Sequence, residues 1–311
     1  MKIKKTAITI IGAGTIGQGI AEVVARAGME VYLKEKYPEL LDKGMQAITA
    51  NLDTEIGKWG LTEGEKKAIL SRIHPVSDDE VLGDSAFIIE AIQENLADKA
   101  RLFAKLDRVA GPDTIFITNT ALLSITEIAS HTQRADKVMG MCFLHPVGRI
   151  KVVELIRGLA TSDATFAAVK HLAARLGKSV FDLGIPMWLG KTPVAVFEYP
   201  GFITTRVIIP FVNEAMYVLM EGVATAEDID TALALGFRME QGPLHIADRV
   251  GLDVIMGWME SLFRELGDAR YRPCPLLRKM VRAGHLGCKS GRGFFEYNGE
   301  GKEVPRKAAG K

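Results

Sequence analysis

The N-terminal region contains, over residues 6–28, the stretch TAITIIGAGTIGQGIAEVVARAG. A short β-branched run leads into Gly12, Gly14 and Gly17, after which the pattern becomes helical. This order is typical of the first βα turn of a dinucleotide-binding unit. Gly12 makes the tight turn, Gly14 lets the backbone approach a pyrophosphate, and Gly17 lets the helix pack closely on the strand. The stretch therefore predicts a nucleotide-binding βαβ unit.

The residues after the glycines indicate which dinucleotide is bound. Thr15 and Ile16 begin the helix, whose free N–H groups and dipole favour phosphate. A second predicted strand delivers Glu35, about 20 residues beyond the middle glycine, where an acidic residue bonds the ribose hydroxyls of NAD and repels the extra phosphate of NADP. We therefore predict NAD. Lys34 and Lys36 leave room for NADP, although we interpret both as solvated surface lysines.

Composition narrows the classes of partner. The 311 residues include 39 Lys and Arg against 38 Asp and Glu, a formal net charge of +1. This balance gives no reason to expect a nucleic acid or membrane partner, so we expect a small-molecule substrate. Cys142, Cys274 and Cys288 are odd in number and lack metal-ligand spacing, which favours a reducing, cytoplasmic location and no metal site.

Strand and helix signals alternate through the first half of the chain, as in a mostly parallel sheet. Further strand signals span residues 87–91, 114–119 and 137–143, and a helical excursion covers residues 38–73. Ligands bind such sheets at the C-terminal ends of the strands. We therefore expect Glu90, Asn119 and the segment 142–145 to face the cofactor.

The second half of the chain shows helical signals only. They cover residues 203–221, 225–235, 244–266 and 276–283. A Pro-Gly pair at 200–201 breaks the chain before the first of them. We predict a nucleotide-binding α/β domain over residues 1–198 and an all-α domain over residues 199–311.

The motifs taken together resemble the 3-hydroxyacyl-CoA dehydrogenase family almost from end to end. The stretches that carry the resemblance are Gly12–Gly17, Glu90–Lys99, Asn119–Thr120, Val152–Ile156, Pro200–Ile203, Gly242–Leu244, Gly251–Asp253 and Lys289–Tyr297. The resemblance implies a Rossmann domain, a helical domain that forms a homodimer, and a substrate cleft between them. It also implies NAD contacts from Ala91, Glu94 and Lys99, with Asn119 at the same edge, and a CoA thioester held near Lys58.

The site departs from the family pattern at several positions. The family has a serine after Asn-Thr, a histidine opening the strand-end motif, and an asparagine before the arginine that follows Pro-Gly-Phe. Here these positions hold Ala121, Cys142 and Thr205. The glutamate twelve residues beyond the family histidine is retained as Glu154, and His145 stands where the family has asparagine.

These departures leave the proton acceptor open between several interpretations. His145 is one candidate, oriented by Glu154, since an imidazole titrates near working pH. Glu154 itself and an ordered water are the other acceptors for the hydroxyl proton of an alcohol substrate. Cys142 is another, as a thiolate that turns the site towards aldehyde oxidation, or else a buried space-filling thiol. In the third, the family reaction is lost and Glu154 remains as a charge partner or a surface residue at a strand end.

We predict an NAD-dependent oxidoreductase that transfers a hydride between NAD and a hydroxyacyl-CoA or a related hydroxy acid. Ala121 and Thr205 line the predicted substrate pocket. With Cys142, they are smaller than the family's residues at these positions and leave more room in the pocket, so a bulky or cyclic substrate is one hypothesis. The alternatives are an aldehyde-oxidising enzyme and a nucleotide-binding homologue without the family activity. Residues 179–188 look like an insertion, forming either a roof over the cleft or an edge hairpin.

Overall fold

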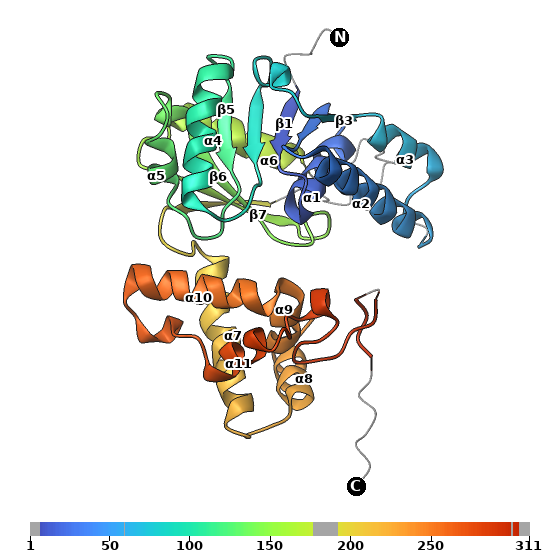
Figure 1. Ribbon diagram of the computed structural model, residues 1–311, viewed down its shortest axis with the longest axis vertical. Coiled ribbons are helices and arrows are strands. Elements are labelled where there is room, and N and C mark those ends of the chain that lie inside the picture. The colour runs from blue at the N-terminus through green and yellow to red at the C-terminus, as the bar shows by residue number, and fades with distance from the viewer. Residues whose placement is uncertain (1–6, 59, 177–191, 300, 305–311) are drawn as a thin grey trace. The chain divides into compact units, whose positions relative to one another are not determined.

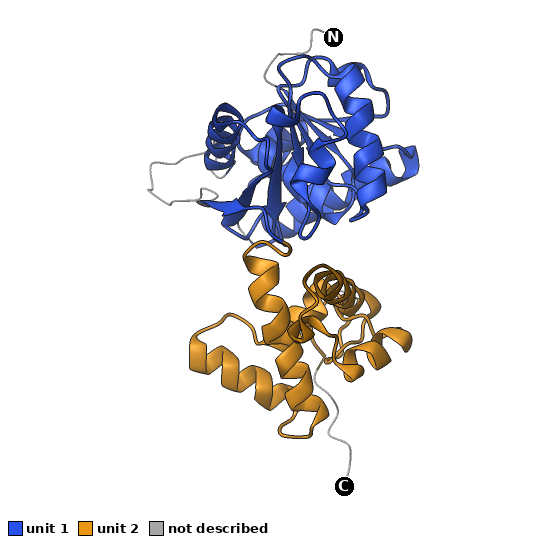
Figure 2. Ribbon diagram, turned by 90° about the vertical axis from the view of Figure 1, so that its left-hand side faces the viewer, with its two compact units in different colours: residues 1–199 blue, residues 200–311 orange. Residues whose placement is uncertain are grey.

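The computed structural model describes residues 7–58, 60–176, 192–299 and 301–304, so the predicted insertion at 179–188 lies outside the described residues. The chain divides into two compact units, residues 1–199 and residues 200–311 (Figure 2). Each unit has its own secondary structure.

The first unit is built on one eight-stranded sheet in the order β3-β2-β1-β4-β5-β6-β7-β8 (Figure 1). The strands are β1 (Ile8–Ile11), β2 (Val31–Lys34), β3 (Ile73–Val76), β4 (Phe87–Glu90), β5 (Ile115–Thr118), β6 (Val138–Phe143), β7 (Val152–Arg157) and β8 (Thr192–Phe197). All neighbours are parallel except β6 and β7, which run antiparallel. The predicted mostly parallel α/β fold is confirmed.

Helices cover both faces of this sheet. They are α1 (Thr15–Arg26), α2 (Pro38–Ile56), α3 (Glu63–Leu70), α4 (Leu96–Val109), α5 (Ile125–Ala129) and α6 (Asp163–Arg175), with 3₁₀ turns at Glu80–Leu82 and Ala135–Lys137. One apolar core joins α1, α2, α3 and α6 to alternate strand residues such as Ile10 and Leu33. On the other face, Phe103 of α4 packs edge-on against Phe116 of β5. Because both faces are covered, β1 and β2 are buried along their whole length.

Three strands go beyond the sequence prediction. The end of the predicted helical excursion is strand β3, whose Ile73-His-Pro-Val76 includes a proline. Proline is tolerated there because β3 is an edge strand of the sheet. Strands β7 and β8 extend the sheet past the third predicted strand signal. Strand β7 places Glu154 in mid-strand, 2% exposed, so its interpretation as a surface residue at a strand end is wrong.

The second unit is helical (Figure 1). Its helices are α7 (Thr204–Met220), α8 (Ala226–Phe237), α9 (Pro243–Val250), α10 (Leu252–Leu266) and α11 (Pro275–Arg282), with 3₁₀ turns at Ala269–Tyr271 and Cys288–Ser290. The single helix predicted over 244–266 is wrong, because Gly251 has φ +105° and breaks it into α9 and α10. The predicted helical C-terminal domain is confirmed.

No helix in the described part of the chain is long and apolar enough to cross a membrane.

Candidate functional site

The glycine loop between β1 and α1 has the geometry of a nucleotide site. A Cβ on Gly17 would lie 1.8 Å from the carbonyl oxygen of Gly12, and a Cβ on Gly12 would lie 2.6 Å from that of Ala91. Gly12 also has φ +109°, which favours glycine. A Cβ on Gly14 would meet no protein atom within 4 Å. Two glycines are therefore needed for packing, whereas the third leaves open space in front of the loop.

The N-terminus of α1 opens onto that space. Gly14 is its N-cap residue, in extended conformation, and no side-chain hydrogen bond caps the helix there. The first-turn N–H groups, including those of Thr15 and Ile16, are therefore not capped by a side chain and form an anion site. This is the arrangement that the pyrophosphate of a dinucleotide requires.

Glu35 follows β2 and places its carboxylate beside the glycine loop. Its Oε2 accepts a hydrogen bond from Ala13 N at 3.0 Å, and its Oε1 accepts one from Lys36 N at 2.7 Å. The acid lies where a ribose attached to the pyrophosphate would be bound. The glycine loop, the open helix terminus and this acid together fit NAD.

The interpretation of Lys34 as a solvated lysine is wrong. The residue is 9% exposed, and Nζ donates to the carbonyl oxygens of Ser77 and Asp78 and pairs with Asp79 at 3.1 Å. The charge of Lys34 is therefore paired with acceptors in the segment that follows β3. Lys36 is exposed, as expected.

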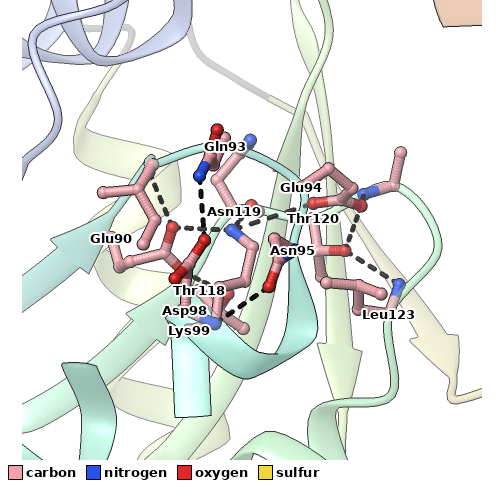
Figure 3. A network of polar contacts seen from close by, with 12 residues as sticks. Glu90, Gln93, Glu94, Asn95, Asp98, Lys99, Thr118, Asn119, Thr120 and Leu123 are labelled. Carbon is pink, nitrogen blue, oxygen red and sulfur yellow. Dashed lines mark hydrogen bonds and ion pairs between the residues drawn. The ribbon is translucent and has the colours of Figure 1, made fainter. Parts of the chain in front are cut away.

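A buried polar network joins the C-terminal ends of β4 and β5 to the start of α4 (Figure 3). Lys99 Nζ donates to Glu90 Oε1 at 2.6 Å and to the carbonyl oxygen of Asn119 at 2.8 Å. Glu90 Oε2 accepts from Thr118 Oγ1 at 2.6 Å, and its Oε1 accepts from Ile92 N at 2.7 Å. Burial raises the pKa of Glu90, while Lys99 opposes that shift.

Glu94 lies in the loop between β4 and α4, and its carboxylate binds the segment that follows β5. Its Oε1 accepts hydrogen bonds from Thr120 Oγ1, from Ala121 N at 2.9 Å and from Leu122 N at 3.2 Å. Its Oε2 lies 3.7 Å from Lys99 Nζ. Ala121, predicted to line the substrate pocket, thus contributes a backbone donor to this loop. The sequence analysis predicts no role for the threonine hydroxyls of the network. Their only signal in the sequence is their position at the end of a strand.

Strand pairing brings Cys142 and Glu154 directly opposite each other on β6 and β7. Both side chains are buried, Cys142 at 4% and Glu154 at 2% exposure. Burial, together with the negative charge of Glu154, raises the pKa of the Cys142 thiol well above its ordinary range. The thiol is therefore protonated at neutral pH, which does not favour the thiolate needed for aldehyde oxidation.

The remaining candidates belong to other elements of the chain. His145 is an exposed residue of the connection between β6 and β7. Thr205 belongs to the second unit, where it is buried on α7. Lys99, which the resemblance assigns to the cofactor, has a side chain that is 0% exposed. No cluster of metal-binding side chains occurs among the described residues.

The second unit holds a separate charged cluster around His245 of α9. Its Nδ1 lies 2.6 Å from Asp230 Oδ2 and its Nε2 lies 3.1 Å from Glu303 Oε2, and its ring stacks on Phe295. The hydrogen bond to Asp230, followed by that to Glu303, raises the pKa of His245.

The raised pKa of His245 predicts a pH-dependent contribution to stability. The ion pairs stabilise the fold fully below the ordinary histidine pKa of about 6.5 and are lost as pH rises through the higher folded value. We expect the melting-temperature difference between the protein and a His245→Gln variant to be largest in mild acid and to shrink towards alkaline pH. Thermal unfolding followed across that range measures it, and a difference that does not vary with pH contradicts the expectation.

Fold and site together define a two-domain, dinucleotide-binding dehydrogenase. The chain matches the family model for the 3-hydroxyacyl-CoA dehydrogenase NAD binding domain over residues 7–184 and that for the C-terminal domain over residues 201–297. It therefore belongs to the 3-hydroxyacyl-CoA dehydrogenase family, whose first domain binds NAD.

Relatives and solved structures agree with this assignment. A probable 3-hydroxybutyryl-CoA dehydrogenase of Bacillus subtilis (strain 168) is 44% identical over 297 residues, which are 96% of this chain and 98% of the relative. The human mitochondrial hydroxyacyl-coenzyme A dehydrogenase is 35% identical, covering 93% and 90%. The crystal structure of (S)-3-hydroxybutyryl-CoA dehydrogenase from Ralstonia eutropha has TM-score 0.83 and 40% identity, covering 94% and 99%. The predicted NAD-dependent oxidoreductase is confirmed, and the two alternative functions are not favoured.

Proposed function

We propose that this protein oxidises the hydroxyl group of a 3-hydroxyacyl-CoA with NAD, and that it does so without the family's histidine. The observation that carries the proposal is the match of both family domains along nearly the whole chain. Relatives named as 3-hydroxybutyryl-CoA dehydrogenases at 42% to 44% identity support a CoA thioester as the substrate.

Bound NAD supplies the hydride acceptor of this reaction. The residues of this chain that hold it are the glycine loop, the first turn of α1 and Glu35. We further propose that Glu94 and Asn119, at the adjoining strand ends, orient the part of the cofactor that reacts. Ala91 contributes to this arrangement through its carbonyl oxygen, which packs against Gly12.

We propose Glu154 as the acceptor of the substrate's hydroxyl proton. It is a buried carboxyl directly opposite Cys142, where the family pattern has its histidine. The Cys142 thiol is a poor proton acceptor because the charge and burial that raise its pKa also keep it protonated. His145 is the competing acceptor, and the variants Glu154→Gln and His145→Ala separate the two.

A substrate panel tests the function. NADH formation is followed from NAD with linear and cyclic 3-hydroxyacyl-CoAs, the corresponding free hydroxy acids, and aldehydes. We expect turnover of at least one acyl-CoA. Preference for a bulky or cyclic acyl group would support the wider pocket that Ala121 and Cys142 imply. Turnover of aldehydes alone, or of nothing despite NAD binding, contradicts the proposal.

The glycine loop gives a test of the cofactor site that does not require a substrate. Gly14→Ala adds a methyl group to open space in a backbone conformation that alanine adopts, so we expect an unchanged melting temperature. The same methyl group obstructs the pyrophosphate, so we expect the Kd for NAD to rise by about 10-fold or more, the effect of losing roughly 1.4 kcal/mol. Calorimetry measures binding.

Gly236→Ala is the matched control for that variant, since a Cβ there also meets no atom within 4 Å but lies on α8 of the second unit. It should leave NAD affinity unchanged. Equal NAD affinity in Gly14→Ala and in the unaltered protein would contradict the assignment of the open space to the pyrophosphate.

We propose that the second unit forms a homodimer. Large apolar side chains are exposed on its helices and turns: Val207 at 66%, Val223 at 70%, Leu235 at 77% and Phe237 at 73%. Such exposure is typical of a surface that another chain covers.

The three free cysteines fit a reducing compartment, so we propose that the protein is located in the cytoplasm.

A charge placed on α8 tests the dimer. We expect the Leu235→Glu/Phe237→Glu double variant to be monomeric by light scattering while the unaltered protein is dimeric, because two buried like charges oppose association. Val109→Glu, an exposed apolar position at the end of α4, is the control and should remain dimeric. A monomeric unaltered protein, or a dimeric double variant, contradicts this interface.

A further inference from the structure

Lys99 is buried in a way that is unusual for a lysine. It lies in the first turn of α4, after the N-cap Asn95, and its side chain has no exposed surface. Lysine is almost never fully buried unless its charge is paired. The pairing here is supplied by Glu90, whose side chain is also completely buried. Removing such a pair from water costs free energy. The other hydrogen bonds that the two residues make therefore indicate the role of the pair in the fold.

The second hydrogen bond of the ammonium goes to the backbone. Lys99 Nζ donates to the carbonyl oxygen of Asn119 at 2.8 Å, immediately after β5. The amide N–H of Asn119 in turn donates to the carbonyl oxygen of Glu90 at 2.7 Å. Asn119 is thus held on both its donor and its acceptor side by the same ion-paired residues.

Asn119 passes this constraint to the next strand. Its side-chain Oδ1 accepts a hydrogen bond from the backbone N–H of Phe143 at 3.0 Å. The pairing of β5 with β6 ends at Thr118 and Gly140, so this bond ties the two strands together beyond the end of their ladder. Phe143 directly follows Cys142, which faces Glu154 across β6 and β7.

We infer that Lys99 is a positioning residue: acting through the carbonyl of Asn119 and the amide of Phe143, it fixes the end of β6 against Glu154 rather than contacting NAD itself. Asn119 is the intermediate, and Glu90 holds the ammonium in place. This inference rests on the proposed function for its effect on turnover, but its effect on the backbone is independent of any substrate.

Amide hydrogen exchange in the full chain without ligand tests the backbone step. In Lys99→Met we expect the Phe143 amide to exchange about 10-fold faster, because Asn119 Oδ1, which accepts its hydrogen bond, is no longer held in place. Glu90→Gln/Lys99→Met removes both charges, so it keeps the test open if the single variant folds poorly. We expect the same loss of protection at Phe143 in the double variant.

NAD affinity and turnover separate positioning from direct contact. For Lys99→Met we expect the Kd for NAD to change by less than about 2-fold, as for groups that do not touch. With the acyl-CoA that the panel identifies, we expect kcat to fall by about 10-fold or more at an unchanged KM for NAD. Adding Lys99→Met to Asn119→Leu should lower kcat no further than Asn119→Leu alone, because the two act in series.

Arg134→Met is the matched control, because it removes a cation that pairs with Asp107 at 2.7 Å near the other end of α4. It should leave Phe143 protected. The inference is overturned if Phe143 stays protected in the Glu90→Gln/Lys99→Met variant, or if Arg134→Met exposes Phe143 equally. It is also overturned if Lys99→Met weakens NAD binding by about 10-fold or more while Phe143 stays protected, which would make Lys99 a cofactor contact. Absence of turnover in the panel would refute the proposed function while leaving the exchange result to stand.

Discussion

Replacing Glu154 by glutamine is expected to lower kcat by about 100- to 10,000-fold, the range that a positioned general base contributes. Glutamine keeps the shape of the buried side chain on β7 but cannot take a proton. The Kd for NAD should not change, because Glu154 lies on β7 rather than beside the glycine loop. Initial rates of NADH formation, with the acyl-CoA that is turned over best, give the result.

Two further variants make this outcome specific. Glu127→Gln neutralises an exposed glutamate of α5 in the same unit and should leave kcat unaltered. His145→Ala removes the competing proton acceptor. If His145→Ala abolishes turnover while Glu154→Gln retains it, the roles are reversed and Glu154 is not the base.

The glycine loop shows what could be predicted from sequence. Its three glycines and Glu35 are local signals. The residues that make the tight turn, allow the helix to pack closely and supply the acid after the second strand all lie within one short segment. The structure gives Gly12 a positive φ and gives Gly17 a neighbouring carbonyl that no side chain could tolerate. Local chemistry of this kind constrains local geometry, so the βαβ unit follows from the sequence.

Interactions between distant segments could not be predicted in the same way. Lys34 and Lys99 have the residue type most often found at the surface, and only tertiary packing supplies the acceptors that bury them. The register that places Cys142 opposite Glu154 depends on an antiparallel pair inside a mostly parallel sheet. Helical periodicity continues across Gly251, so the break between α9 and α10 appears only in the backbone conformation.

Cys142→His is expected to raise kcat by about 10-fold or more. Side chains directly opposite on antiparallel strands have Cβ atoms about 4.5 to 5.5 Å apart, so an imidazole at this position reaches the carboxylate of Glu154. A histidine held by a carboxylate is a better proton acceptor than the thiol it replaces. The larger side chain costs about 1 to 3 kcal/mol in packing, so the melting temperature should fall.

The pH dependence distinguishes this gain from a general change in the pocket. The new imidazole has an ordinary pKa of about 6.5, which the neighbouring carboxylate raises, so kcat/KM in the variant should increase as pH rises through that value. Cys142→Asn adds volume without adding a base. It should show neither the increase in kcat nor the increase in kcat/KM as pH rises. Adding Glu154→Gln to Cys142→His should remove most of the gain, because the imidazole then loses the group that orients it. A rate increase shared equally by the histidine and asparagine variants would mean that pocket shape, and not a restored proton acceptor opposite Glu154, limits this enzyme.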